Sequence, residues 1–270
     1  MKITFIGLGN MATAMVGGII KAGLVEKEDI CGFDISEAAR KQAKATFGIG
    51  LGTDNKNAID GADVVILAIK PQVAAAVLAE IKDSLAPDAI IVSIMAGKSI
   101  AWIAEQLRGA NASPTQPKIV RAMPNLPALV GEGMSGVCRS AAVSDVEMDK
   151  ALRLLESFGR AEEIPETLID AVIGVSGSAP AYVFIFIEAL ADAGVAAGMM
   201  REQAYRFASQ AIIGSARMLQ EGTGHPGELK DMVCSPGGTT IEAVKVLEEK
   251  GFRSAVIAAA LAAVEKSKLL

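Results

Sequence analysis

The chain has 270 residues, of which 51% are apolar but only 4% aromatic, and its formal net charge is −5. Such a length allows one large or two small domains, and an aliphatic core favours packed helices and buried parallel strands over a β-sandwich or barrel. The acidic balance, without a stripe of lysine or arginine, makes nucleic acid and an anionic membrane poor partners. Three widely spaced cysteines argue against a disulfide framework or structural zinc and predict a metal-free protein of a reducing compartment, the cytoplasm.

The N-terminal segment has the pattern strand, glycine-rich turn, helix and strand. A β-rich run at residues 2–7 leads into residues 7–12 (GLGNMA), which fit G-x-G-x-x-A, and apolar residues follow at helical spacing. A second strand at 29–33 ends at Asp34, about twenty residues beyond the glycines, as in the dinucleotide fingerprint. The first glycine makes the tight turn, the second admits a pyrophosphate, and Ala12 allows the helix to pack closely. The uncharged run 3–20 is therefore interpreted as strand, turn and helix, not as a signal peptide or membrane span.

Three further apolar runs, at residues 63–69, 89–94 and 118–123, have the composition of buried strands. Because they are β-branched and separated by helical segments, they predict a parallel sheet that is covered on both faces. Ligands of such sheets bind beyond the carboxyl ends of the strands. We therefore expect Lys70, residues 95–97 and Asn125 at the edge where a nicotinamide would lie.

Asp34 bears on the choice of cofactor. A carboxylate at this position accepts hydrogen bonds from both ribose hydroxyls and repels a 2′-phosphate, which favours NADH. Arg40 and Lys41 follow within one or two helical turns and could hold a phosphate, so NADPH stays open. The alternative for Asp34 is a helix N-cap or a solvated turn residue.

Past residue 130 the pattern changes from α/β to helical. We predict a strand at 131–138, an amphipathic helix at 145–158 and an edge strand at 160–164. From residue 168 onward only alanine- and leucine-rich helical patterns follow, at 168–175, 179–197, 201–222, 227–234, 239–250 and 252–268. The chain is thus predicted to be an α/β protein with a Rossmann-like dinucleotide-binding domain at 1–164 and an all-helical domain at 165–270. Because the helical domain would expose apolar stripes if it stood alone, we expect it to self-associate.

The segment 225–241, HPGELKDMVCSPGGTTI, contains a turn that ends in two glycines and two threonines opening a helix. Glycines before a helix let backbone N–H groups converge on an anion such as a carboxylate. Thr239 and Thr240 stand beside this turn as uncharged proton donors. His225, the single histidine, is a rival acid, although a His-Pro pair that enters a helix is more often structural.

Several motifs together resemble the pyrroline-5-carboxylate reductase family: GLGNMA, AIKPQ, RAMPNLPA, GVSGSAPAYVF and above all HPGELKDMVCSPGGTTIEA. They occur in order over the whole chain. The resemblance implies reduction of 1-pyrroline-5-carboxylate to L-proline, the final step of proline synthesis, with NADPH or NADH. It also implies dimerisation through the helical domain, a possible decameric ring of dimers, and active sites formed between subunits.

The same motifs and the resemblance assign the site residues. Cofactor contacts are predicted at Ile6, Gly7, Leu8, Gly9, Asn10, Met11, Ala12, Asp34, Asn55, Ala68, Ile69, Lys70, Pro71, Ala96, Gly97 and Asn125. Substrate contacts are predicted at Glu166, Ser235, Gly237, Gly238, Thr239 and Thr240, with Thr240 as the catalytic hydroxyl that faces the ring nitrogen. Two positions depart from the family pattern: Ala179 replaces a usual glycine, and Thr223 stands where an acid is common. We therefore give Thr223 no role, and His225 is also given none.

The chemistry of imine reduction agrees with these residues. It requires a hydride donor and a nitrogen that is kept protonated or hydrogen-bonded, and a threonine hydroxyl is sufficient in kind. Two alternatives remain. A β-hydroxyacid-type dehydrogenase is expected to carry a catalytic lysine early in its helical domain, and residues 166–200 contain none. A non-catalytic dinucleotide sensor predicts an eroded substrate loop, whereas Ser235–Thr240 is intact.

Overall fold

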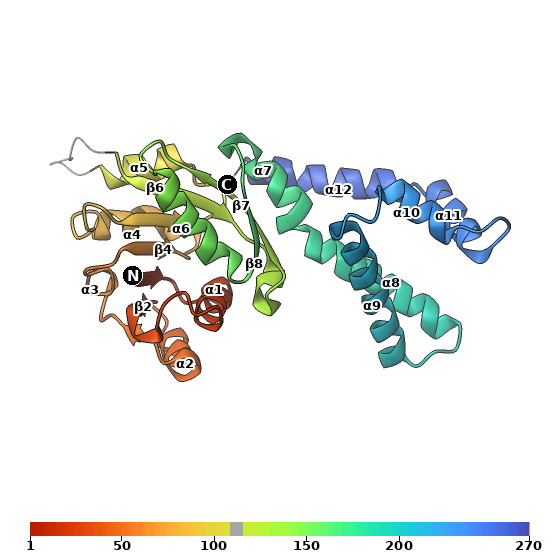
Figure 1. Cartoon of the computed structure of the whole chain (residues 1–270), viewed down its shortest axis with the longest axis horizontal. Helices are drawn as coiled ribbons and strands as arrows, with labels where there is room; N and C mark the ends of the chain where they lie inside the picture. Colours follow the sequence, from red (N-terminus) through yellow and green to blue (C-terminus); the bar gives the residue numbers. More distant parts are fainter. Residues whose placement is uncertain (109–115, 270) are drawn as a thin grey trace. The chain divides into compact units, whose positions relative to one another are not determined.

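The computed structural model describes residues 1–108 and 116–269, which divide into two compact units (Figure 1). The first consists of Met1–Gly177 and Ala263–Leu270, and the second of Ser178–Ala262. The predicted fold class, a Rossmann-like α/β part followed by helices, is confirmed. The last strand ends at Glu163, next to the predicted domain boundary at 164 and 165, while the packing units divide later, after Gly177.

A single eight-stranded sheet forms the centre of the first unit, with the strand order β3-β2-β1-β4-β5-β6-β7-β8. The strands are β1 (Ile3–Ile6), β2 (Ile30–Phe33), β3 (Gly50–Leu51), β4 (Val64–Leu67), β5 (Ile90–Ser93), β6 (Lys118–Met123), β7 (Gly133–Arg139) and β8 (Gly159–Glu163). The first six are parallel, β7 pairs antiparallel with β6, and β8 is parallel to β7. All predicted strands are present; the two-residue β3 and the reversed direction of β7 were not predicted.

Helices cover both faces of this sheet, as the continuous apolar strands predict (Figure 1). One face carries α1 (Asn10–Lys21), α2 (Glu37–Phe47) and α6 (Asp145–Glu156), and the other carries α3 (Asn55–Ala58), α4 (Ala74–Ile81) and α5 (Ile100–Leu107). Short 3-10 turns occur at η1 (Lys27–Asp29), η2 (Pro71–Val73), η3 (Leu126–Val130) and η4 (Glu166–Leu168). Successive strand residues point to opposite faces, so Phe5 enters one core cluster and Ile6 the other.

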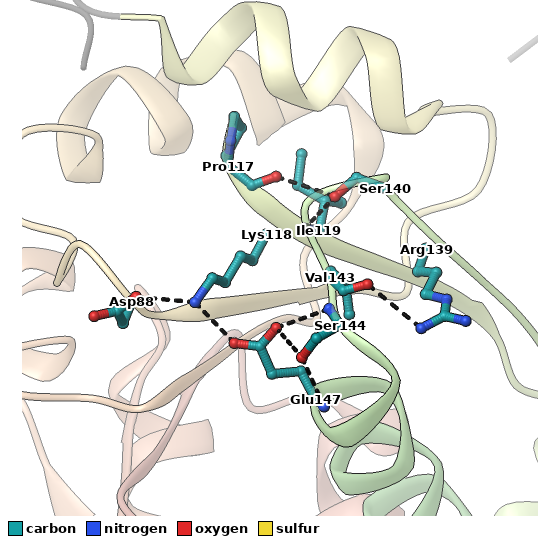
Figure 2. Close-up of polar contacts among 9 residues, drawn as sticks. All are labelled: Asp88, Pro117, Lys118, Ile119, Arg139, Ser140, Val143, Ser144 and Glu147. Atoms are coloured by element: carbon teal, nitrogen blue, oxygen red, sulfur yellow. Dashed lines mark hydrogen bonds and ion pairs between the residues drawn. The ribbon is translucent and has the colours of Figure 1, made fainter. Parts of the chain in front are cut away.

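Polar contacts fix the amino end of β6 (Figure 2). The Lys118 ammonium lies 2.9 Å from a carboxylate oxygen of Asp88 and 2.8 Å from one of Glu147. Glu147 also completes a capping box at the start of α6, because its second oxygen accepts the Ser144 N–H at 2.9 Å. Hydrogen bonds from Lys118 and Ser144 lower the pKa of the Glu147 carboxyl to about 2. One ion pair thus joins the sheet to a helix start.

The second half of the chain is helical. Its elements are α7 (Ile169–Val172), the π-helical segment η5 (Ile173–Gly177), α8 (Ala179–Ala196), α9 (Arg201–Gln220), α10 (Pro226–Val233), α11 (Thr239–Glu249) and α12 (Phe252–Ser267). The predicted helices over this region are confirmed. Helices α8 and α9 approach closely at Gly194, where an added Cβ would lie 3.1 Å from that of Ala204.

Large apolar side chains of the second unit lie open in the single chain. Phe184 is 55% exposed, Ile185 65%, Phe207 70% and Ile213 57%. Residues 166–196 are long and apolar enough, with a mean hydropathy of 1.6, to pass for a membrane span by length and composition alone. Large apolar side chains that are exposed together on two helices are a feature of interaction surfaces.

Candidate cofactor and substrate sites

The glycine-rich loop after β1 lies against the end of β4. Gly7 has φ +93°, and a Cβ at this position would stand 2.4 Å from the Ala68 carbonyl oxygen and 3.1 Å from the Ile69 side chain. Gly7 also donates its N–H to the Phe33 carbonyl at 2.8 Å. The fold therefore brings together Gly7, Ala68 and Ile69 at the carboxyl edge of the sheet, and a side chain at residue 7 would separate them.

The first turn of α1 fits a diphosphate. Gly9 is exposed, and an added Cβ would have no atom within 4 Å, so the backbone can be approached there. In the described part of the chain no side chain caps α1, and its first turn carries no acidic residue. The N–H groups of this turn and the positive end of the helix dipole are therefore available to an anion. Asn10, Met11 and Ala12 all belong to this turn.

Asp34 holds the glycine-rich loop from the end of β2. One carboxylate oxygen accepts the Leu8 N–H at 2.8 Å, and the other accepts the Ser36 N–H at 2.8 Å. Arg40 donates to the backbone carbonyl of Asp34, and its guanidinium lies 5.3 Å from the ring centroid of Phe33. Lys41 forms an ion pair with Glu37 at 2.7 Å. The contact between Asp34 and a ribose stays a prediction, and the Arg40 guanidinium places a positive charge beside the Asp34 backbone.

The remaining predicted cofactor residues follow the ends of β3, β4 and β5. Asn55 is 7% exposed at the start of α3, and its amide donates to Glu80 at 2.8 Å. Lys70 and Pro71 follow β4 after Ala68 and Ile69, and the Lys70 side chain is exposed. Gly97, with φ +70°, and Ala96 form the turn between β5 and α5. Each segment lies at the edge where the sequence places it.

Asn125 is bound on both sides of its amide. The amide oxygen accepts the Met134 N–H at 2.9 Å, and the amide nitrogen donates to the Ser176 hydroxyl at 3.0 Å and its carbonyl at 3.3 Å. Ser176 belongs to the π-helical segment η5, and such segments occur often at functional sites. Asn125 thus fixes the turn after β6; its contact with a cofactor stays a prediction.

Glu166 forms an ion pair with Arg121, which was not predicted from the sequence. One oxygen accepts the Ile100 N–H at 2.8 Å and the Arg121 guanidinium at 2.9 Å. Arg121 is only 6% exposed within β6. A charged residue inside the apolar run KIVRAM was the sequence feature that could have indicated a buried ion pair. The predicted contact of Glu166 with substrate stays a prediction.

The predicted substrate loop belongs to the second unit. Gly237 has φ +66°, and the Gly238 N–H donates to the Ser235 carbonyl at 3.0 Å, which closes a turn directly before α11. The positive φ of Gly237 favours glycine there, and a Cβ at Gly238 would lie 2.3 Å from the Ser235 hydroxyl and would displace it. Among the described residues no side chain caps α11, whose first residues are Thr239 and Thr240. The turn thus presents free N–H groups and two hydroxyls together.

His225 and Thr223 make local structural contacts. The His225 Nδ1 accepts the Gly227 N–H at 3.1 Å, and Glu228 accepts the His225 N–H at 3.0 Å, so His225 is the N-cap of α10. The Thr223 hydroxyl donates to the Met218 carbonyl at 2.6 Å. These contacts give His225 and Thr223 roles at helix ends.

Two family models match the chain. One, described as pyrroline-5-carboxylate reductase dimerisation, matches residues 166–270, and the other, described as NADP oxidoreductase coenzyme F420-dependent, matches residues 2–97. The first model covers the predicted helical domain, which begins at residue 165. The second covers the glycine-rich loop, Asp34, Asn55 and the turn at Gly97.

Relatives and solved structures agree over the full length. The chain is 49% identical to the pyrroline-5-carboxylate reductase of Escherichia coli strain K12, over 100% of this chain and 98% of that one. It is 41% identical to the enzyme of the same name from Methanosarcina acetivorans, over 100% and 97%. A pyrroline-5-carboxylate reductase structure from Coxiella burnetii superposes with a TM-score of 0.90 at 35% identity, covering 99% of this chain and 97% of that one. The chain therefore belongs to the pyrroline-5-carboxylate reductase family.

Proposed function

We propose that the protein reduces 1-pyrroline-5-carboxylate to L-proline with NADPH or NADH, the final step of proline biosynthesis. The observation that carries the proposal is full-length identity of 49% to a reductase of that name, combined with an intact substrate turn at Ser235–Thr240. A solved Plasmodium falciparum relative, with a TM-score of 0.87 and 34% identity over 99% of this chain and 97% of that one, has NADP bound. The fit of the α1 first turn to a diphosphate supports the same cofactor class here.

Two parts of the chain hold the reactants in this proposal. The loop Gly7–Ala12 binds the diphosphate through the uncapped N–H groups that open α1, and Asp34, Asn55, Lys70, Ala96 and Gly97 line the rest of the cofactor. The turn at Gly237 and Gly238 holds the substrate carboxylate through the Gly237 N–H and the uncapped N–H groups that open α11, and so orients its C=N carbon. The Gly238 N–H closes the turn. When bound, the reduced nicotinamide supplies the hydride that this carbon accepts.

Thr240 is the side chain that we assign to the reacting nitrogen. Its hydroxyl donates a hydrogen bond to the ring nitrogen, which makes the C=N carbon a better electrophile and assists proton delivery as the nitrogen becomes an amine. Placement of such a donor contributes about 10²–10⁴-fold in rate. No charged acid is needed, because the ring nitrogen is basic enough to take its proton from water, while the Thr240 hydroxyl only donates a hydrogen bond to it.

The partners and location are part of the proposal. The family model over residues 166–270 and the exposed apolar side chains of α8 and α9 support self-association through the helices; the decameric ring stays a prediction. Three free cysteines support a reducing compartment, the cytoplasm.

A direct spectrophotometric assay tests the proposed function. Purified protein is mixed with NADH or with NADPH under identical conditions, 1-pyrroline-5-carboxylate is added, and the absorbance of the reduced nicotinamide is followed. The proposal predicts its loss with at least one cofactor, and Asp34 predicts a higher rate with NADH. No loss with either cofactor would exclude the reductase function. When a β-hydroxyacid is added with NAD⁺, no reduction of NAD⁺ to NADH is expected.

A further inference from the structure

Arg121 is a buried charge at the carboxyl end of β6. It is 6% exposed and lies between Ser93 of β5 and Cys138 of β7 in the sheet register. Its Nε has no hydrogen-bond partner among the described residues. Burying a guanidinium is costly unless it is paired, so its partner is expected to matter.

Its partner joins three segments that are distant in the sequence. The Arg121 Nη1 lies 2.9 Å from one oxygen of Glu166, at the start of η4. The same oxygen accepts the N–H of Ile100, the first residue of α5, at 2.8 Å. Arg121 therefore holds the carboxylate that holds the start of α5.

The start of α5 is also the end of the turn predicted to lie beside the nicotinamide. Residues 94–99 connect β5 to α5 and include Ala96 and Gly97. At one end of this turn the Ile94 N–H donates to the Leu67 carbonyl at 3.2 Å. At the other end Glu166 accepts from Ile100. Ala96 and Ile100 also pack against the buried Met123, Cys138 and Ile169. Both ends of the turn are thus tied to the sheet edge.

We propose that Arg121 and Glu166 form a positioning pair that sets the turn 94–99 for the nicotinamide half of the cofactor. The inference rests on the proposed function and assigns Glu166 to the protein's own backbone rather than to substrate. Neither residue touches the reacting atoms. The pair acts through Ile100, and its loss lets the turn shift while the diphosphate loop, held separately by Gly7 and Asp34, keeps its shape.

The same strand supplies a matched control. Lys118, at the opposite end of β6, forms ion pairs with Asp88 and with Glu147, which also caps a helix start (Figure 2). Lys118→Met therefore breaks a comparable strand-to-helix ion pair that lies at the amino edge of the sheet. It is expected to affect stability without affecting the turn 94–99.

The test compares ligands with and without the nicotinamide. For wild type, Arg121→Met, Arg121→Lys, Glu166→Gln and Lys118→Met, calorimetry gives Kd for the oxidised form of the preferred cofactor and for the matching ADP-ribose or 2′-phospho-ADP-ribose. We expect Arg121→Met to raise the Kd of the whole cofactor roughly tenfold and to lower kcat by roughly ten- to a hundredfold. Small misplacements of a reacting group have effects of this size. The Kd of the ADP-ribose ligand should change by less than about twofold, because this ligand lacks the nicotinamide ring that the turn positions.

The other variants complete the comparison. Arg121→Lys keeps the charge and should recover part of the whole-cofactor affinity. Glu166→Gln keeps an acceptor for Ile100 and should be intermediate, and Lys118→Met should leave the ratio of the two Kd values unchanged. Equal weakening of both ligands by Arg121→Met, or a wild-type ratio with wild-type kcat, overturns the inference. If Arg121→Met does not fold, Arg121→Lys and Glu166→Gln decide by the same ratio, and inactivity of the wild type counts against the proposed function alone, since the ratio needs no substrate.

Discussion

Thr240 is the residue whose hydroxyl performs the proposed proton chemistry, so its removal has a specific expected effect. Thr240→Ala should lower kcat by about 10²-fold or more, because no other donor replaces the hydroxyl at the ring nitrogen. Cofactor affinity, measured by fluorescence titration, should stay nearly unchanged. Thr240→Ser should recover much of the activity because it restores the donor.

Thr223→Ala is the control for Thr240→Ala. It removes a hydroxyl that donates to the Met218 carbonyl, outside the proposed site, and should leave kcat near wild type. A collapse of cofactor binding in Thr240→Ala would show that the turn at Ser235–Thr240 has been given the wrong role.

Substitutions at Gly7 and Gly9 are expected to distinguish an effect on folding from an effect on cofactor binding. Gly7→Ala should destabilise the fold by about 1–3 kcal/mol, because it places a side chain at a positive φ and 2.4 Å from the Ala68 carbonyl. Gly9→Ala has open space and φ −74°, so its melting temperature should match wild type while cofactor Kd rises. Melting curves and cofactor titrations measure both effects. A Gly9→Ala variant with wild-type affinity would show that no diphosphate approaches that backbone.

At the scale of elements, the junction of β6 and α6 makes a prediction about pH. The pKa of Glu147 is lowered from 4.5 to about 2 in the folded chain by hydrogen bonds from Lys118 and Ser144. Its contribution to the free energy of unfolding is therefore present above pH 4.5 and is lost as pH falls toward about 2. Glu147→Gln should be less stable than wild type at neutral pH, with a difference that shrinks through this range in urea titrations. A difference that stays constant down to the lowest pH would contradict the assignment.

The positions of the elements and the parallel direction of the central strands were predictable, while the direction of β7 was not. Apolar runs predicted β1, β4, β5 and β6 because parallel strands covered on both faces must be apolar throughout. The antiparallel direction of β7 could not be predicted, since alternation of side chains is the same in either direction. The two-residue β3 is too short to leave a pattern.

The candidate site was predictable only in its local parts. Glycine positions follow from backbone requirements that are visible in the sequence, as at Gly7 and Gly237. Contacts between distant segments were not predictable. The Leu8 N–H on Asp34 and the Arg121 guanidinium on Glu166 depend on which strand ends become neighbours in the fold.

At the scale of the whole molecule, the helices of the second unit explain why the chain is expected to work as an oligomer. Phe184 and Phe207 are more than half exposed, and a helical stretch that could pass for a membrane span lies in the region matched by a dimerisation model. Apolar helices that a monomer leaves open are explained by a second copy of the same chain. A membrane is not needed to explain them.

In the proposed reaction the chain transfers hydride from a nicotinamide to the C=N carbon of 1-pyrroline-5-carboxylate. The most direct measurement uses cofactor that carries deuterium at the transferred position and identifies the product by mass spectrometry and NMR. We expect L-proline with one deuterium at the former imine carbon, in an amount equal to that of the cofactor oxidised. Proline without deuterium, or cofactor oxidised without proline, would contradict it.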